Sequence, residues 1–329
     1  MVYVLYFVLA ALVIFLSIKL AKYVDWLDKS TNISGAFIGG VLLAAVTSLP
    51  ELFTSISATL FLHQNELVLG NILGSNLFNF AVLGLSLVIF IKSVYSAGLK
   101  KSHLLSLGVM LCMYGFVALD VFLDVWPKIG WFSLSSPIIL ALYIGYLFLT
   151  PKTEEAEDEA SDEVTLSLKQ IIIRFVICAV LLVAASIAIT YVSDWMAREL
   201  GLGMTFAGAL LLGVATSLPE MASTLSLCRR KNYNAAFGNI LGSNVFNCTI
   251  LVIADLLSFT SGSTDVYTFN VSSELLIILG AIIAVLFAAM LGLFAIRREG
   301  RIFKRISAGV IGISAVAAYI IFTALSLVL

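Results

Sequence analysis

The pentapeptide Thr-Ser-Leu-Pro-Glu occurs twice in the chain, at 47–51 and at 216–220. A second shared segment, Gly-Asn-Ile-Leu-Gly-Ser-Asn, follows each copy, at 70–76 and 238–244. The paired copies are 169 and 168 residues apart, so the chain is a tandem duplication. Both motifs lie within long apolar stretches, where a proline followed by a carboxylate is unfavourable. Their presence at matching places indicates that the two copies work together.

The composition predicts a polytopic membrane protein. Of its 329 residues, 61% are hydrophobic and 12% are charged, and the mean hydropathy is +1.08. A soluble domain has about half apolar and about a quarter charged residues. The expected partner is therefore the lipid bilayer. The net charge of −1 gives no reason to expect nucleic acid as a partner.

Apolar segments of about 20 residues are long enough to span a bilayer as helices. Ten segments qualify, at 2–22, 33–62, 66–91, 103–123, 131–150, 170–192, 203–228, 235–258, 272–296 and 305–328. The second, third, seventh and eighth carry the repeated motifs and contain Pro, Gly, Ser, Asn and Glu. We therefore expect an all-α fold of ten transmembrane helices, in which broken helices 2, 3, 7 and 8 form the core.

The repeat divides the chain into two halves of five helices, at 1–150 and 169–329. An acidic segment at 151–168 separates them, with its carboxylates at Glu154, Glu155, Glu157, Asp158, Glu159, Asp162 and Glu163. It is too polar to span a membrane, and we interpret it as a solvated linker. A cation-collecting or regulatory role is the alternative.

The basic residues predict the orientation of the helices. All of the 19 Lys and Arg residues except Lys128 and Arg198 lie in or next to the odd-numbered loops. Since cytoplasmic loops are rich in Lys and Arg, we expect these loops in the cytoplasm and both termini outside. Five helices per half then make the second repeat enter the membrane from the opposite side. Such inverted repeats are typical of transporters with a site at the membrane midplane.

Hydroxyl side chains accompany the carboxylate of each pentapeptide, because residues four apart share one helix face. The two sets are Thr47, Ser48, Glu51 and Ser55, and Thr216, Ser217, Glu220 and Thr224. A proline ring crowds the carbonyl four residues earlier, so backbone oxygens are freed as ligands or must be satisfied in another way. The candidate carbonyls are those of Val46, Ala215, Ala44 and Gly213.

The second motif adds neutral oxygens and small residues. Ser75 and Asn79 are four apart, as are Ser243 and Asn247, with Asn76 and Asn244 between them. For Asn71 and Asn239, interhelical hydrogen bonding and a role in the site remain open. Glycines permit close helix approach and occur at 70, 74, 238 and 242.

Glu51 and Glu220 are the only carboxylates that we place near mid-bilayer, and we expect no Lys, Arg or His beside them. Two unmatched carboxylates there are unfavourable unless protons or cations neutralise them. The surrounding ligands are all oxygens, which suit Ca²⁺ and Na⁺. His63 and His103 are expected in solvated loops. Such a site favours ion exchange, because the empty site would resist crossing. No cofactor is expected beyond the transported ions.

At these motifs the chain resembles the sodium/calcium exchanger family of the calcium/cation antiporter superfamily, in its prokaryotic ten-helix type. Thr-Ser-Leu-Pro-Glu and Gly-Ser-Asn-x-x-Asn, each in both halves, match the two alpha-repeats of the family. The resemblance implies eight core helices, with the first and sixth sliding past them as a gate. It also implies a central group of cation ligands, namely Thr47, Ser48, Glu51, Ser75, Asn79, Thr216, Ser217, Glu220, Ser243 and Asn247. In the family, the glutamate pair holds Ca²⁺ and the hydroxyls help to form Na⁺ sites.

The sequence departs from the family pattern at two places. Many members have Gly before the Thr of the pentapeptide, where this chain has Val46 and Ala215. Some relatives, including potassium-dependent exchangers, have Asp at the position of Asn247. Asn on both sides argues against potassium co-transport. Both departures concern ion selectivity more than fold.

The function predicted from the sequence is secondary-active antiport that extrudes Ca²⁺ in exchange for Na⁺, in a prokaryotic plasma membrane. The first alternative exchanges H⁺ for a divalent cation on the same fold. An intramembrane enzyme would need a nucleophile or a metal motif, and neither is found. A cation channel usually builds its filter from a symmetric oligomer, whereas both half-sites here lie on one chain.

Overall fold

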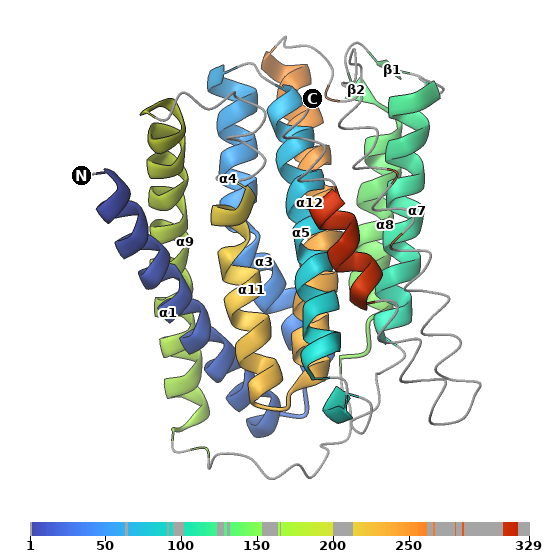
Figure 1. Ribbon diagram of the computed structural model, residues 1–329. Coiled ribbons are helices and arrows are strands. Elements are labelled where there is room, and N and C mark those ends of the chain that lie inside the picture. Colours follow the sequence, from blue (N-terminus) through green and yellow to red (C-terminus); the bar gives the residue numbers. More distant parts are fainter. Residues whose placement is uncertain are drawn as a thin grey trace.

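The computed structural model describes residues 2–62, 65–90, 92–94, 102–123, 128–129, 132–152, 166–199, 213–261 and 312–321, and the single residues 164, 266, 280 and 285. Long helices pack side by side in a bundle (Figure 1). Six helices in this part of the chain are long and apolar enough to cross a membrane. The fold is that of an all-α polytopic membrane protein.

The first half contains α1 (Val2–Ser30), a segmented second helix, α5 (Asn65–Ile89), α7 (Ser102–Leu123) and α8 (Ser135–Leu149). Two short antiparallel strands, β1 (Lys128–Ile129) and β2 (Phe132–Ser133), connect α7 to α8. The second half contains α9 (Leu168–Glu199), α11 (Gly213–Arg229) and α12 (Tyr233–Ser261). Helices therefore occur in the first eight predicted spans. The ninth and tenth, and the acidic linker, lie largely outside the described residues, although 312–321 includes a helix.

The second helix is interrupted where the sequence predicts it. It consists of α2 (Gly35–Phe37), the π-helical η1 (Ile38–Leu43), α3 (Ala44–Thr47), α4 (Leu49–Ser57) and the π-helical η2 (Ala58–Leu62). Ser48 leaves the helical conformation, with φ −90° and ψ 2°. Pro50 then lies in the first turn of α4, where a missing backbone N–H has no intrahelical partner to lose.

The expected breaks in the third, seventh and eighth helices do not occur in the described residues, since α5, α11 and α12 are each continuous. The reason in α5 and α12 is that their Gly, Ser and Asn residues retain the backbone N–H. Pro219 lies inside α11, and Ser223 Oγ donates to its carbonyl at 2.6 Å. Pro219 removes one backbone hydrogen bond, that to the Ala215 carbonyl, and the helix continues through it.

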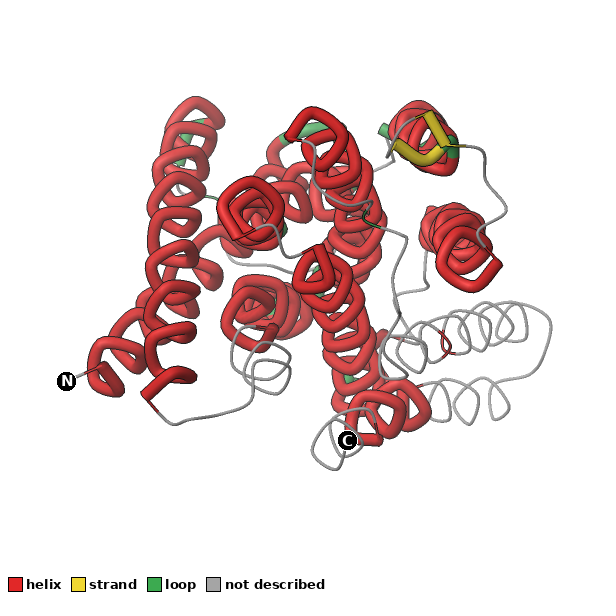
Figure 2. Tube along the Cα trace, turned by 90° about the horizontal axis from the view of Figure 1, so that it is seen from above, coloured by secondary structure: helices red, strands yellow, loops and turns green. Residues whose placement is uncertain are grey.

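Equivalent helices of the two halves run in opposite directions. In Figure 1, α1 descends and α9 ascends, and likewise α5 descends and α12 ascends. α1 and α9 contact each other and lie at one edge of the bundle when it is seen from above, whereas the short strands mark the opposite edge (Figure 2). This is the inverted arrangement that the odd number of helices per repeat predicts.

Close backbone contacts join the second helix to the start of α12. A Cβ added at Gly242 would overlap the carbonyl of Gly40, and one added at Gly39 would overlap the carbonyl of Ala235. A Cβ at Gly238 would lie 2.8 Å from the carbonyl of Ala36. Small residues permit this approach, as is usual between membrane helices.

A tight corner connects α11 to α12. Asn232 N–H donates to the Leu227 carbonyl and Lys231 N–H to the Cys228 carbonyl, both at 3.0 Å, which is the Schellman pattern. Lys231 takes the left-handed conformation, with φ 62°. Asn232 Oδ1 accepts from the N–H of Ala235 at 3.1 Å and so caps α12.

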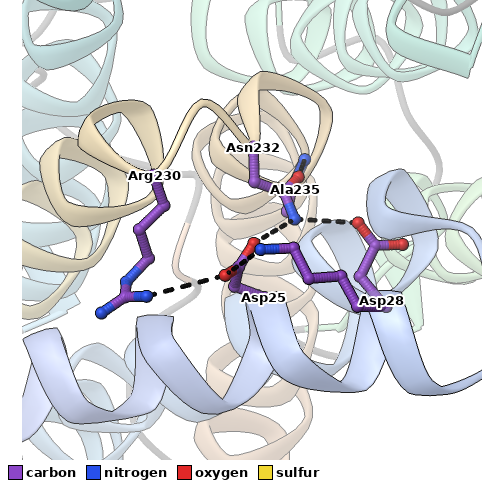
Figure 3. A network of polar contacts seen from close by, with 6 residues as sticks. Asp25, Asp28, Arg230, Asn232 and Ala235 are labelled. Carbon is purple, nitrogen blue, oxygen red and sulfur yellow. Dashed lines mark hydrogen bonds and ion pairs between the residues drawn. The ribbon is translucent and has the colours of Figure 1, made fainter. Parts of the chain in front are cut away.

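Hydrogen bonds and an ion pair connect the same corner to α1 (Figure 3). Asn232 Nδ2 donates to Asp28 at 2.8 Å and to Asp25 at 3.3 Å. The Asp25 carboxylate is fully buried and pairs with Lys29 at 2.7 Å and with Arg230 at 3.6 Å. A buried charge is tolerated when it is paired in this way.

The prediction for His103 is wrong. It lies in α7 with 2% of its surface exposed, and its Nε2 is 3.1 Å from Asn234 Oδ1 at the start of α12. A polar partner on a neighbouring helix allows the ring to be buried.

Candidate functional site

Glu51 and Glu220 are both fully buried in the bundle. Each accepts a hydrogen bond from the serine that precedes the other glutamate. Ser48 Oγ donates to Glu220 Oε1 at 3.3 Å, and Ser217 Oγ donates to Glu51 Oε1 at 3.5 Å. The two pentapeptides, far apart in sequence, therefore meet face to face.

The serines of the second motif extend this contact. Ser75 Oγ donates to Glu51 Oε1 at 3.0 Å and lies 2.7 Å from Ser217 Oγ. In the other half, Ser243 Oγ lies 3.3 Å from Thr47 Oγ1. Each second-motif serine thus contacts a pentapeptide of the opposite half, and Ser75 also contacts its own.

The asparagines of α5 and α12 form a crossed pair of hydrogen bonds. Asn79 Nδ2 donates to Asn244 Oδ1 at 2.9 Å, and Asn247 Nδ2 donates to Asn76 Oδ1 at 2.7 Å. Asn76 Nδ2 also contacts the hydroxyl of Tyr114. The sequence assigned no role to Asn76 and Asn244, although their separation of 168 residues marks them as equivalents.

Four buried oxygens in this cluster have no hydrogen-bond partner in the described part of the chain. They are Glu51 Oε2, Glu220 Oε2, Asn79 Oδ1 and Asn247 Oδ1. Buried polar atoms normally have a partner, so these four oxygens are available to a ligand. The same atom is unpartnered in each equivalent pair. Carboxylate and amide oxygens are the ligands that hard cations prefer, so the residues fit a cation as cargo.

Among the described residues of this cluster, the two glutamates are the charged ligands. Neither glutamate forms an ion pair with another described residue, and the described residues include no group of three or more His, Cys, Asp and Glu that could hold a metal ion. The site therefore offers a charge of −2 when both carboxylates are ionised, surrounded by neutral oxygens.

The remaining predicted site residues are placed as follows. Thr216 and Ala215 are fully buried, and Val46 is half-buried. The Ala44 carbonyl accepts from Ser48 N–H at 3.0 Å and also from Thr47 Oγ1 and Ser243 Oγ, so its oxygen faces the site but is already bonded. Gly213 is the first residue of α11.

The equivalent asparagines Asn71 and Asn239 differ in their contacts. Asn239 Nδ2 donates to Ser223 and Thr224, both at 3.0 Å, and its Oδ1 accepts from Thr47 at 3.5 Å. Neither amide atom of Asn71 has a partner among the described residues. For Asn239, the structure favours interhelical bonding next to the carboxylates.

Two inverted helical repeats around a buried set of oxygens define a membrane transporter of cations. Comparison with known families agrees with this class: the model described as sodium/calcium exchanger protein matches residues 1–150 and 170–328. The chain belongs to the sodium/calcium exchanger family, whose members are transporters and not enzymes.

Individual relatives cover most of the chain. The inner membrane protein YrbG of Escherichia coli (strain K12) is 27% identical over 288 residues, which are 84% of this chain and 85% of that protein. The uncharacterized membrane protein MJ0091 of Methanocaldococcus jannaschii is 30% identical over 220 residues, 65% of this chain and 68% of that protein. A structure of the sodium-calcium exchanger NCX_Mj, soaked with 10 mM Na⁺ and zero Ca²⁺, shares the fold, with a TM-score of 0.70 and 23% identity over 98% of both chains.

Proposed function

We propose that this cation antiporter moves Ca²⁺ out of the cytoplasm in exchange for Na⁺, with Glu51 and Glu220 as ligands of one shared site. The observation that supports the proposal is the set of four buried, unpartnered oxygens on the two glutamates and on Asn79 and Asn247. In this proposal the repeats 1–150 and 169–329 supply half of the site each, and the acidic segment 151–168 links them.

The charge of the site explains why exchange is favoured over one-way transport. One Ca²⁺ or two Na⁺ neutralise two carboxylates. An unneutralised carboxylate at mid-bilayer costs about 2.5–3.5 kcal/mol on insertion scales. The empty site therefore resists the conformational change, and a cation must accompany each crossing.

The hydroxyls provide the remaining ligands in this proposal. Those of Thr47, Ser48, Ser75, Thr216, Ser217 and Ser243 would turn from their present partners toward bound Na⁺. The carbonyls of Ala44, Val46, Gly213 and Ala215 are the backbone candidates. Neutral oxygens of this kind suit Na⁺, which needs less negative charge than Ca²⁺.

The orientation of the chain completes the proposal. The bias of Lys and Arg places the odd-numbered loops in the cytoplasm and both termini outside. The membrane would be the plasma membrane of a prokaryote, which is consistent with the name of the Escherichia coli inner membrane relative.

Coupling to H⁺ is the second candidate. It is favoured by the surroundings of the two glutamates, whose hydrogen-bond partners include serine hydroxyls. Protons would neutralise the carboxylates as well as Na⁺ does. Some relatives have Asp at the position of Asn247. With Asn there, the described residues around the two glutamates include no third acid.

Ion fluxes in proteoliposomes separate the two candidates. We expect ⁴⁵Ca²⁺ uptake to follow an imposed Na⁺ gradient and to be unaffected by a K⁺ gradient. Uptake driven by a pH gradient in the absence of Na⁺ would refute Na⁺ coupling and support the second candidate.

Substitution of the carboxylates tests the shared site. We expect Glu51→Gln and Glu220→Gln each to reduce exchange at least 100-fold, because either removes half of the site charge. Glu199→Gln, which changes an exposed glutamate at the end of α9, serves as the matched control and should retain exchange. Exchange above a tenth of the starting rate in either site variant would contradict the proposal.

A further inference from the structure

A cavity outside the central site lies between α1 and α11. Its volume is about 510 Å³, within the range of roughly 300–1,000 Å³ that is common for small-molecule sites. Ile14 and Ile18 of α1 and Met221 and Leu225 of α11 line its inner part. This part is apolar and lies away from the α11–α12 corner.

The other end of the cavity is basic. Its lining there includes four cations, Lys29, Arg229, Arg230 and Lys231, and one carboxylate, that of Asp25. Asp25 is already paired with Lys29 and Arg230, as Figure 3 shows for Arg230. Four positive charges against one negative charge leave an excess of positive charge at the mouth.

On both helices the apolar lining residues are separated from the basic ones along the helix axis. Lys29 follows Ile14 by 15 residues on α1, about 22 Å along a helix. On α11, Met221, Leu225 and Arg229 are four apart and share one face. The cavity therefore leads from the apolar interior of the membrane to a basic rim at the end of the bundle where the sequence places the cytoplasm.

We propose that this cavity binds an anionic phospholipid, with an acyl chain along Ile14, Ile18, Met221 and Leu225 and the phosphate at Lys29, Arg229 and Lys231. Basic pockets between membrane helices on the cytoplasmic side are suited to anionic headgroups. The apolar inner part selects a lipid over a free anion. A bound lipid contacts α1 and the helix that carries Glu220 at the same time. The binding does not depend on which ions the protein exchanges.

The test is lipid binding to the purified full chain, measured by native mass spectrometry with phosphatidylglycerol as the probe. We expect one saturable phosphatidylglycerol per chain that phosphatidylcholine and millimolar inorganic phosphate do not displace. Equal retention of phosphatidylcholine would overturn the proposal, and so would displacement by inorganic phosphate, which would show an anion site.

Two variants locate the binding. Arg229→Gln with Lys231→Gln removes rim charge but keeps the Asp25–Arg230 contact, and should weaken binding at least tenfold. The control Lys169→Gln with Arg174→Gln removes the same charge from the exposed start of α9 and should change binding less than threefold. Equal losses in both pairs would show general surface attraction and overturn the site.

A third variant keeps every charge. Leu225→Trp fills the apolar part of the cavity, and we expect it also to weaken binding at least tenfold. Unchanged binding in a variant that elutes as a single folded species would contradict the acyl-chain position. Neutralising the acidic residues of 154–163 should leave binding unchanged. A tenfold gain would show that this segment of the chain occupies the rim instead of a lipid.

Discussion

Asn71 and Asn239 occupy the same position in two copies of one heptapeptide, but their surroundings differ. Asn239 is hydrogen-bonded to Ser223 and Thr224, whereas neither amide atom of Asn71, nor the Oγ of Ser55, has a partner among the described residues. The glycines repeat this contrast. A Cβ added at Gly242 would overlap the Gly40 backbone, whereas a Cβ added at Gly74 would contact nothing within 4 Å.

The contrast separates the two ends of the site. The bonded set lies between the carboxylates and the α11–α12 corner, the end that the basic residues assign to the cytoplasm. The unbonded set lies toward the end of α4 and the start of α5. We infer that the site is more hydrated toward the second end, because the polar atoms beside the site that lack a partner among the described residues lie there. Alternating access requires such an inequality between repeats of like sequence.

The largest difference is expected from one substitution made in both repeats. Gly242→Ala forces a methyl group into the Gly40 backbone and should cost about 1–3 kcal/mol or more, since overpacking displaces helices. Gly74→Ala should be close to neutral. Thermal unfolding of the purified variants and ⁴⁵Ca²⁺ exchange measure both. Equal losses of stability would remove the contrast between the two ends.

Removal of the asparagines should give a smaller difference in the same direction. Asn239→Ala breaks two donated hydrogen bonds to α11 and should cost about 1–2 kcal/mol. Asn71→Ala loses no hydrogen bond to a described residue, so a change below about 0.5 kcal/mol is expected. Thermal unfolding under identical conditions provides the comparison, and a larger loss for Asn71→Ala would reverse it.

Hydration can be tested with cysteines at Ser55 and at its equivalent Thr224. In a background without the native cysteines, we expect Ser55→Cys to react with a water-soluble thiosulfonate at least tenfold faster than Thr224→Cys. Arg174→Cys, exposed on α9, controls for reagent quality. Faster labelling of Thr224→Cys would show that the first end is the more hydrated one. The native cysteines to be replaced are Cys112, Cys178, Cys228 and Cys248.

The smallest effect is expected at the contact between α1 and the corner. Arg230→Gln removes one partner of Asp25 at 3.6 Å, while Lys29 at 2.7 Å and Asn232 remain. A loss of about 0–1 kcal/mol follows, as for other partly exposed ion pairs. The residue equivalent to Arg230 in the first repeat is Phe61, which is 76% exposed and cannot make this contact. A loss as large as that of Gly242→Ala would mean that this contact stabilises the bundle as much as the glycine packing does.

The sequence predicted the elements of the site but not its asymmetry. Periodicity and motif spacing located the first eight helical spans and grouped Glu51 with Glu220. Identical heptapeptides carry identical local preferences, so no pattern within them could distinguish Asn71 from Asn239. Their difference arises from how whole helices pack. Helix packing also determines the crossed hydrogen bonds of Asn76 and Asn244. It likewise buries His103 beside Asn234, which no local pattern predicts.

The crossed asparagines have a consequence for the direction of transport. Asn79 donates to Asn244, and their equivalents in the other half, Asn247 and Asn76, form the same contact. Two identical subunits related by a two-fold axis contact each other in this way, and here the two halves of one chain do so. Because the halves are inverted, the two-fold axis lies in the plane of the membrane. In the proposed site, a cation on that axis would face equivalent residues of the two halves whichever side it entered from. The ion gradients would then set the direction of net flux. The parts of the protein that break the symmetry could still make transport faster in one direction than in the other.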